Sequence, residues 1–488
     1  MHTINVEVHR EIEHRDCDPL AFYKSAADKL GADKVFILES LSGPSRDRKA
    51  TIIGLDPLFS VEIHEGYANL KGNSDLLGRL GQQISGNGFH LDYNARVSLP
   101  DSDSVWNLLR ALQQPFEVPR FTNPSMAFFG YLSYDTIRFI ENITSKAAKT
   151  NEYPLIALTV FQTLVYFHAG GSVETLINNA SLWKTRSRDE YAEYFEQHLP
   201  SKWAEAPTIY PDESEVRDSV RKEQFLGWVD QALHHISIGD IYQIQMGHEV
   251  QVDSPVSPLD VYRALRRNNP SPYMYLAQLG GIDLIGASPE LFVRIKDDLI
   301  EMRPIAGTVG KKSGISSSEL ILSMMHSEKE RAEHVMLVDL CRNDIGRVCQ
   351  PGSLEVDELM LVEEYSHLYH MVSNVRGLLR KGHDAFDVIK ASFPAGTMTG
   401  APKVRAMQII EDMENNRRGI YAGAVGLIGF DGSVNTALCI RSAVYKDGTY
   451  YLRASAGVVA DSEPEKEWME TFYKMSSVYR AVTGKEMI

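Results

Sequence analysis

Three apolar runs near the C-terminus are joined by two Asp-Gly pairs, and this arrangement restricts the fold strongly. The runs cover residues 424–430, 436–445 and 450–454, and the pairs are Asp431-Gly432 and Asp447-Gly448. An Asp-Gly pair between apolar runs is a strong hairpin signal, because both residues tolerate the positive φ angles that tight turns require. The sequence therefore predicts antiparallel strands in this region.

Helix-like and strand-like segments alternate along the rest of the chain. Residues 223–235 have the spacing of a helix and lead into a predicted strand at 240–245. Further runs that predict strands cover 35–38, 51–54, 60–63, 155–167, 284–285 and 291–295. The sequence has no βαβ pattern typical of dinucleotide-binding proteins. We therefore predict an α/β protein with much antiparallel sheet.

The clearest boundary lies near residues 200–214, where Pro, Ala, Asp and Glu interrupt the apolar pattern. This boundary divides the chain into an N-terminal part, residues 1–200, and a C-terminal part, residues 215–488. The total of 488 residues is long enough for two ordinary domains.

The composition argues against several classes of protein. The four cysteines form no CxxC pair, so neither a disulfide framework nor a structural zinc site is expected. The N-terminal segment lacks the apolar core of a signal peptide. Polar residues interrupt the longest apolar stretch, 155–167, which is too short to span a bilayer. These features predict a cytoplasmic protein without membrane contact.

The formal net charge of −15 argues against binding to the phosphate backbone of nucleic acids. It also limits how an anionic substrate could be held, because much of the surface would repel it. A small dicarboxylate would need a metal ion and a few buried basic residues to form a local positive site.

One segment carries two glutamates in line with apolar residues. Glu330 and Glu333 are three residues apart, so they share one face of a predicted helix. Leu337 and Leu340 continue that face, which indicates that the carboxylates point inward.

The last predicted helix repeats this arrangement. Glu467, Glu470 and Lys474 form one stripe beside an apolar stripe of Trp468, Phe472, Met475, Tyr479 and Val482. Mg²⁺ prefers a few carboxylates, water and substrate oxygens, so two inward pairs of glutamates could hold it. The alternative is that all four glutamates lie on solvated helix faces, the usual place for this residue type.

Two further segments combine small residues with proline. Residues 303–308 read RPIAGT, and residues 393–403 read FPAGTMTGAPK. The second segment leads into a helix whose free N–H groups could hold a carboxylate, or it is an ordinary capped helix start. His370 lies among apolar residues, where a histidine is more often part of the core than a catalyst. Its neighbour His367 leaves the choice between the two open.

Taken together, these segments resemble component I, the large subunit of anthranilate synthase in the chorismate-utilising enzyme family. The motifs occur in the family's order from about residue 225 to 482, and the resemblance is weaker over residues 1–200. They cover residues 304–308, 327–347, 365–373, 393–403, 420–426 and 456–471. The resemblance implies a large mixed, mostly antiparallel β-sandwich flanked by helices. Residues 1–200 would form an anthranilate-synthase-type subdomain with a regulatory site, and residues 215–488 a chorismate-binding catalytic domain.

The resemblance assigns binding roles to the acidic helices and the loops around them. Mg²⁺ would be surrounded by Glu330, Glu333, Glu467 and Glu470, and it would hold the ring carboxylate of chorismate. Lys474 would add positive charge beside the metal, and Gly307 and Thr308 would contact the substrate. The enolpyruvyl carboxylate of chorismate would lie against Tyr421, Arg441 and the loop Ser455, Ala456 and Gly457. A planar guanidinium suits a carboxylate.

The resemblance also assigns catalytic roles. Glu290 would protonate the C4 hydroxyl as it leaves, and His370 would assist the later loss of pyruvate. Thr308 is also placed among the catalytic residues. Family members that add water carry a lysine base where this chain has Gln243, and glutamine cannot deprotonate water. Aminodeoxychorismate synthases often carry a nucleophilic lysine at the position of Ala306. Both residues favour attack of ammonia on C2.

The implied reaction is amination of chorismate at C2 followed by loss of pyruvate, which gives anthranilate for tryptophan biosynthesis. One alternative stops at 2-amino-2-deoxyisochorismate, and another is a 4-amino-4-deoxychorismate synthase. A third is a non-catalytic scaffold for a glutaminase, although retained buried carboxylates argue against it. Because the sequence lacks a GxCxGxQ-like loop, the resemblance implies that a separate glutamine amidotransferase subunit supplies ammonia within a hetero-oligomer.

Five residues resemble the family's tryptophan feedback site, namely Glu39, Ser40, Pro272, Tyr273 and Met274. Residues 41–49 depart from the Gly-rich family pattern, which leaves inhibition by tryptophan open. Two further departures lie in the expected catalytic domain. Ser455 replaces a glycine, and residues 244–249 replace an apolar-Ser-Arg/Gln pattern. Such departures are compatible with an enzyme of a specialised pathway.

Overall fold

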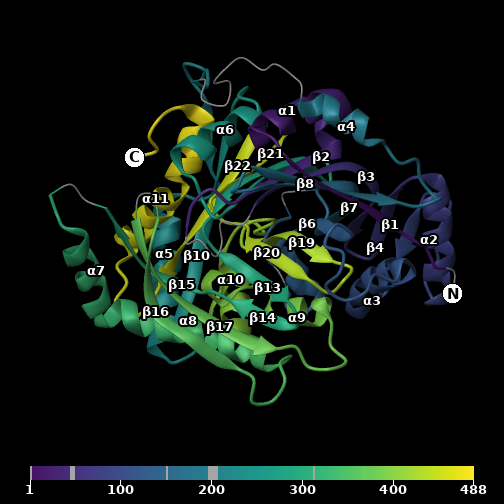
Figure 1. The fold of residues 1–488 in the computed structure, drawn as a ribbon. Helices are drawn as coiled ribbons and strands as arrows, with labels where there is room; N and C mark the ends of the chain where they lie inside the picture. The colour runs from purple at the N-terminus through teal and green to yellow at the C-terminus, as the bar shows by residue number, and fades with distance from the viewer. Residues whose placement is uncertain are drawn as a thin grey trace.

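The strands of the chain join into one continuous network, and helices pack along its outer faces (Figure 1). The computed structural model describes residues 3–43, 50–144, 146–149, 152–195, 207–311, 314–365 and 368–488. Every pairing between named strands is antiparallel. The prediction of an α/β fold built on a large, mostly antiparallel sheet is therefore confirmed.

The network branches at two long strands, β3 (Ala50–His64) and β7 (Ile156–His168), which pair with each other. One arm continues from β3 through β2 (Val35–Glu39), β11 (Tyr273–Leu279), β12 (Ile282–Ser288), β21 (Ser442–Lys446) and β22 (Thr449–Val458) to β10 (Gln243–Asp253). The other continues from β7 through β6 (Ala127–Leu132), β19 (Ala424–Gly429), β20 (Val434–Leu438), β13 (Leu291–Lys296) and β14 (Leu299–Met302) to β17 (Leu368–Leu378).

Both arms contain strands from the two predicted parts of the chain. β2 pairs with β11 and β6 pairs with β19, so the sheet crosses between residues 1–200 and 215–488. The division near residues 200–214 remains a prediction.

Both Asp-Gly turns join hairpins, β19–β20 and β21–β22. The single strand predicted over 436–445 is wrong, because the chain breaks between β20 and β21. Arg441 lies in this break with a φ of 51°, in the left-handed region that non-glycine residues rarely adopt. At the break the backbone oxygen of Arg441 still accepts a hydrogen bond from the Ala287 amide at 3.1 Å. The guanidinium group lies near Tyr421, Glu470 and Glu290.

Two other boundaries differ from the predictions. The runs 51–54 and 60–63 belong to the single strand β3. The strand predicted from residue 240 begins only at Gln243, because Asp240 is held by other contacts. Its carboxylate accepts hydrogen bonds from Arg405 at 2.9 Å and pairs with His235 at 2.8 Å. The predicted helix over 223–235 is confirmed as α5 (Lys222–Ser237).

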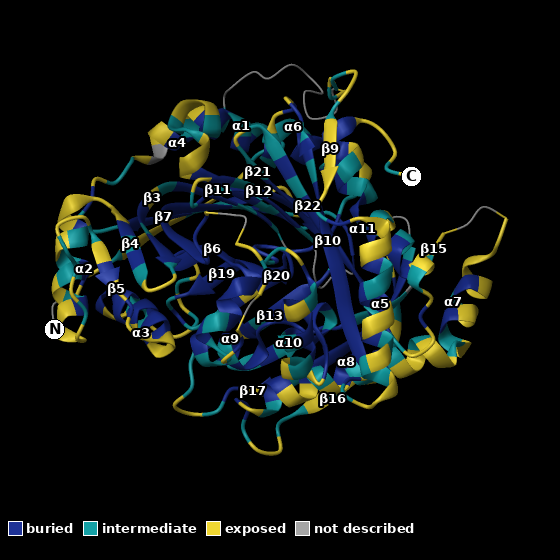
Figure 2. Ribbon diagram, turned by 180° about the vertical axis from the view of Figure 1, so that it is seen from behind, coloured by how far each residue is buried: buried dark blue, intermediate teal, exposed yellow. Residues whose placement is uncertain are grey.

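Three further helices position the predicted site: α8 (Glu328–Gly346), α10 (Lys403–Met413) and α11 (Pro464–Thr483). Buried residues follow the strands, and exposed residues follow the outer faces of the helices (Figure 2). No helix in the described ranges is long and apolar enough to cross a membrane.

Candidate active site

The first pair of glutamates lies on α8, as the spacing predicts. Ser327 caps this helix by accepting a hydrogen bond from the Glu330 amide at 3.3 Å, and Leu337 is buried on the same face. Glu330 and Glu333 are half-buried. Burial raises the pKa of both carboxyl groups, and the charge of Glu470 raises both further. The glutamates of α8 therefore face those of α11.

The second pair lies on α11. Glu467 is buried, and its Oε2 has no hydrogen-bond partner among the described residues. Glu470 forms an ion pair with Lys474 at 2.6 Å, and Lys474 Nζ also donates to the backbone oxygen of Ser455 at 2.8 Å. Lys474 thus ties the acidic face of α11 to strand β22.

Strand β10 places the side-chain amide of Gln243 beside the glutamates of α8. Gln243 is buried, and its Nε2 donates to Glu333 Oε1 at 2.8 Å. Gly457 on β22 lies opposite Gln245. A Cβ at Gly457 would lie 2.9 Å from Gln245 Nε2 and 3.2 Å from Gln243 Nε2. A side chain at 457 would displace the Gln245 amide, so the glycine lets both amides lie against β22.

The four glutamates have the donor chemistry for a hard cation. Burial raises the pKa values of Glu330, Glu333 and Glu467, and the charge of Glu470 raises them further. The buried Glu467 Oε2 has no hydrogen-bond partner among the described residues, so a divalent ion would offset the cost of burying these carboxyl groups. Within the described ranges, however, no three His, Cys, Asp or Glu side chains are grouped closely enough to hold a metal. Instead, the Lys474 ammonium group forms an ion pair with the Glu470 carboxylate. The Mg²⁺ site therefore remains a prediction.

The predicted substrate loop lies beside α8. β15 (Ile305–Gly310) pairs with β17 and has a register shift between Ala306 and Thr308. Gly307, at the shift, has a φ of 73°, and a Cβ there would lie 3.1 Å from Glu330 Oε2. The backbone of Thr308 pairs with that of His370, but its side chain lies outside the described part of the chain.

Glu290 lies between β12 and β13 and is 6% exposed. Burial raises its pKa to about 8, although Thr397 and the backbone of Ile305 provide hydrogen bonds that act against the shift. The charges of Arg441 and Lys474 act in the same direction as these hydrogen bonds. A carboxyl group that is protonated near neutral pH can donate a proton, which is the role predicted for Glu290.

His370 is buried on β17, and burial lowers its pKa to about 4. The charge of Arg441 lowers the pKa further, and a hydrogen bond with the backbone of Gly307 acts the other way. The ring packs edge-on against Tyr365, with 4.9 Å between centroids. His370 is therefore neutral near pH 7 and only a weak base. His367 lies outside the described residues.

Arg441 lies close enough to Glu290 and His370 for its charge to lower the pKa values of both. Burial lowers its pKa, and the nearby Tyr421, Glu470 and Glu290 counteract that effect. Tyr421 is buried at the start of the segment that leads into β19. The structure thus gathers Tyr421 and Arg441 with the general acid and one of the α11 glutamates.

Comparison with known proteins agrees with this geometry. Residues 78–480 match the sequence profile described as chorismate binding enzyme. The chain belongs to the chorismate-binding enzyme family. It is a chorismate-utilising enzyme, and the residues predicted for the site converge where α8, α11, β10 and β22 meet.

Relatives within the family carry different names. The chain is 42% identical over 481 residues to the 2-amino-4-deoxychorismate synthase of Streptomyces globisporus, covering 98% of this chain and 97% of that protein. It is 41% identical over 376 residues to the anthranilate synthase component 1 of Aquifex aeolicus, covering 75% of each. The structure of anthranilate synthase component I from Streptococcus pneumoniae superposes with a TM-score of 0.72 at 29% identity, covering 88% and 92% of the two chains.

The five residues predicted for a tryptophan site line one cavity of about 370 Å³ in this chorismate-binding enzyme. β2 and β11 bring them together, with Glu39 opposite Met274. Glu39 is buried and accepts hydrogen bonds from Tyr262 Oη at 2.8 Å and Arg266 Nε at 2.9 Å. Part of the departing segment, residues 44–49, lies outside the described residues.

Sequence reasoning missed several cavity residues because they come from distant strands. His168, Arg294 and Lys296 also line this cavity and add basic groups to it. The sequence gives no local signal for them, since the sheet alone brings β7, β11 and β13 to one place.

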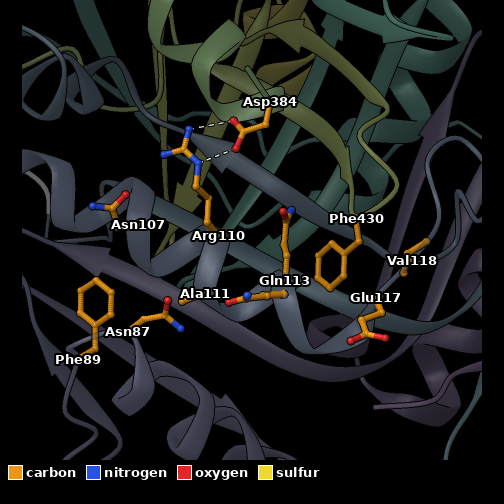
Figure 3. Close-up of a pocket in the computed structure, with 11 residues that line it drawn as sticks. Asn87, Phe89, Asn107, Arg110, Ala111, Gln113, Glu117, Val118, Asp384 and Phe430 are labelled. Carbon is orange, nitrogen blue, oxygen red and sulfur yellow. Dashed lines mark hydrogen bonds and ion pairs between the residues drawn. The ribbon is translucent and has the colours of Figure 1, made fainter. Parts of the chain in front are cut away.

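A second cavity, of about 620 Å³, lies away from the predicted site (Figure 3). Its wall includes Arg110, which donates two hydrogen bonds to Asp384 at 2.6 and 2.9 Å. Both groups are therefore paired, and none of the predicted site residues lines this cavity.

Proposed function

We propose that this enzyme aminates chorismate at C2 with ammonia while the C4 hydroxyl leaves. The observation that carries the proposal is the contact of Gln243 with Glu333 at 2.8 Å. An amide at this position cannot remove a proton from water, whereas ammonia is already a nucleophile. The reaction consumes one chorismate and one ammonia and releases one water.

The residues of the site support the steps of this reaction. Glu290, protonated near neutral pH, donates a proton to the C4 oxygen as the C4–O bond breaks. Nitrogen bonds to C2, the two ring double bonds shift, and the nitrogen then releases a proton. Glu330, Glu333, Glu467 and Glu470 would hold Mg²⁺, whose charge would bind the ring carboxylate.

The fate of the enolpyruvyl group separates two candidate functions. Removal of the C2 proton and cleavage of the C3–O bond would release pyruvate and leave anthranilate. His370 supports this second step by its place near Arg441 and Gly307, where its neutral ring can act as a weak base. We keep anthranilate synthase as the first candidate on this ground.

The second candidate stops after amination. The full-length similarity to a 2-amino-4-deoxychorismate synthase favours it, since that name describes an amino group at C2 and a missing C4 oxygen. The product is the same compound as 2-amino-2-deoxyisochorismate. A 4-amino product is less favoured, because Ala306 cannot act as a covalent nucleophile.

We further propose that ammonia comes from a separate glutamine amidotransferase subunit. Three of the four cysteines, Cys341, Cys349 and Cys439, are buried, and none has the context of a glutaminase nucleophile. Relatives named component 1 imply a partner subunit. The cavity between β2 and β11 is the place we propose for a tryptophan inhibitor.

The test is an assay of the purified chain with chorismate, Mg²⁺ and ammonium, with products separated by chromatography and mass. Anthranilate with pyruvate supports the first candidate. An aminated product that keeps the enolpyruvyl group supports the second. The absence of any nitrogen-containing product, with chorismate bound, would contradict amination.

A further inference from the structure

Gly247 and Ser455 face each other on neighbouring strands. They are direct partners in the pairing of β10 with β22. A Cβ at Gly247 would lie 2.3 Å from Ser455 Oγ and 2.4 Å from the backbone oxygen of Ala454. A Cβ at 247 would overlap the backbone oxygen of Ala454 whatever residue stands at 455, so the close pairing of the two strands itself requires the glycine. The missing side chain at 247 also leaves open space beside the Ser455 hydroxyl.

The hydroxyl of Ser455 is in an unusual state for a core position. Ser455 is 1% exposed, and its Oγ has no hydrogen-bond partner in the described part of the chain. A buried hydroxyl without a partner destabilises a folded protein unless a ligand or water pairs with it. The Ser455 hydroxyl is therefore available to pair with a bound molecule, and its surroundings decide whether one lies there.

The surroundings of Ser455 identify the kind of ligand. Alternate residues of a strand share a face, so Ser455 and Gly457 lie on the same side of β22. Gly457 lies against the amides of Gln243 and Gln245. Lys474 donates to the backbone oxygen of Ser455 and supplies positive charge beside it. A hydroxyl donor next to an ammonium group suits an anionic oxygen.

We propose that Ser455 Oγ donates a hydrogen bond to a carboxylate of bound chorismate, using the space that Gly247 leaves open. The proposal deepens the proposed function and rests on binding of chorismate at this site. It makes Ser455 a substrate-binding residue that acts through its side chain. A family member with glycine at this position would lack this donor.

The experiment measures chorismate binding by calorimetry with Mg²⁺ present and ammonia absent, so that no reaction occurs. For Ser455→Ala we expect the Kd to rise about tenfold, the usual value of one hydrogen bond to a charged group. The same variant should raise KM for chorismate by a similar factor and leave kcat nearly unchanged, since the bond forms equally in ground and transition states.

Two variants complete the design. Ser455→Gly, which removes the hydroxyl together with its Cβ, should raise the Kd by a similar factor. Ser25→Ala is the matched control, because Ser25 is also 1% exposed with an unpartnered hydroxyl but lies on α1 (Pro19–Leu30). Its Kd should stay within about twofold of the original value.

Binding by Ser455→Ala within about twofold of the original Kd would overturn the proposal. If that variant fails to fold, Ser455→Gly decides, because a folded Ser455→Gly protein that binds chorismate within about twofold of the original Kd would also overturn the proposal. Failure of the unmodified chain to bind chorismate would instead contradict the proposed function.

Discussion

Gln243 donates a hydrogen bond to Glu333 at 2.8 Å, while its own amide oxygen is buried without a partner among the described residues. This hydrogen bond connects Gln243, the residue predicted to select the nucleophile, to one of the predicted metal ligands. The free oxygen can accept a hydrogen bond from an incoming N–H group. This geometry suits ammonia, which offers such donors and needs no base.

The first prediction concerns the nucleophile. Gln243→Lys should lower amination about tenfold or more and give a hydroxylated, isochorismate-type product, because a lysine that loses its proton can activate water. Product analysis by mass measures both effects. Gln251→Lys, on the same strand but away from Glu333, should aminate at the original rate. Aminated product alone from Gln243→Lys, at the original rate, would show that Gln243 does not select the nucleophile.

The second prediction concerns the pH dependence of the reaction. Because burial raises the pKa of Glu290 to about 8, the acid form is present below that pH and is lost above it. The rate at fixed free ammonia should therefore fall as the pH rises through about 8. Glu290→Gln should lower kcat by about 10²–10⁴. The control is Glu249→Gln, a buried glutamate on β10 with a raised pKa; an equal loss in both variants would contradict the assignment.

The third prediction concerns stability and uses the same residue. The folded pKa of Glu290 is about 8 and its ordinary value is 4.5, so the group favours the folded state fully below pH 4.5. This contribution is lost as the pH rises through about 8. Glu290→Gln, which stays neutral, should therefore unfold at a higher temperature than the original chain at pH 9 and nearly the same temperature at pH 4. Equal melting temperatures at the higher pH would indicate that Glu290 is not buried as described.

Short-range sequence signals predicted the elements of this enzyme well. The Asp-Gly pairs define both hairpins, and the three-residue spacing of Glu330 and Glu333 places them on one helix face. Such features depend only on neighbours in the chain. The family motifs extended the prediction from single elements to an active site. They indicate which segments, far apart in the sequence, contribute residues to it.

Features set by distant contacts were not predictable from local sequence. The break at Arg441 interrupts an apolar run without a turn residue, and only tertiary contacts explain its φ of 51°. β10 begins late because Asp240 pairs with Arg405, far along the chain. The close approach of Gly247 to Ala454 and Ser455 depends on strand register across more than two hundred residues, which no local pattern encodes.

The fourth prediction concerns the metal. Glu467→Gln removes one of four mutually repelling carboxylates, so Mg²⁺ should raise the melting temperature of this variant less than that of the original chain. A cation at about a hundred times its Kd stabilises the folded state by about 2.7 kcal/mol, which thermal unfolding detects readily. The control, Glu465→Gln, changes an exposed residue of the same helix that pairs with Lys222. An equal response to Mg²⁺ in all three proteins would argue against a metal at these glutamates.

The last prediction concerns the contact that holds α11 on the sheet. His248 on β10 is 1% exposed, and its ring nitrogens lie 2.8 Å from Asp218 Oδ1 and 2.7 Å from Thr471 Oγ1. The ring also stacks on Trp468 with centroids 4.7 Å apart. Trp468 and Thr471 flank Glu470 on α11, so His248 fixes the helix that carries the predicted metal ligands.

His248→Ala should therefore lower the free energy of unfolding by about 3 kcal/mol, since it opens a cavity and leaves Asp218 and Thr471 without this partner. Urea unfolding measures the loss. His235→Ala provides the comparison, because His235 also pairs with an aspartate but is partly exposed on α5, and it should cost about 1 kcal/mol or less. If the helix depends on this contact, His248→Ala will also weaken the response to Mg²⁺, while His235→Ala will not. A similar small loss in both variants would mean that other contacts of α11 suffice to hold it against the sheet.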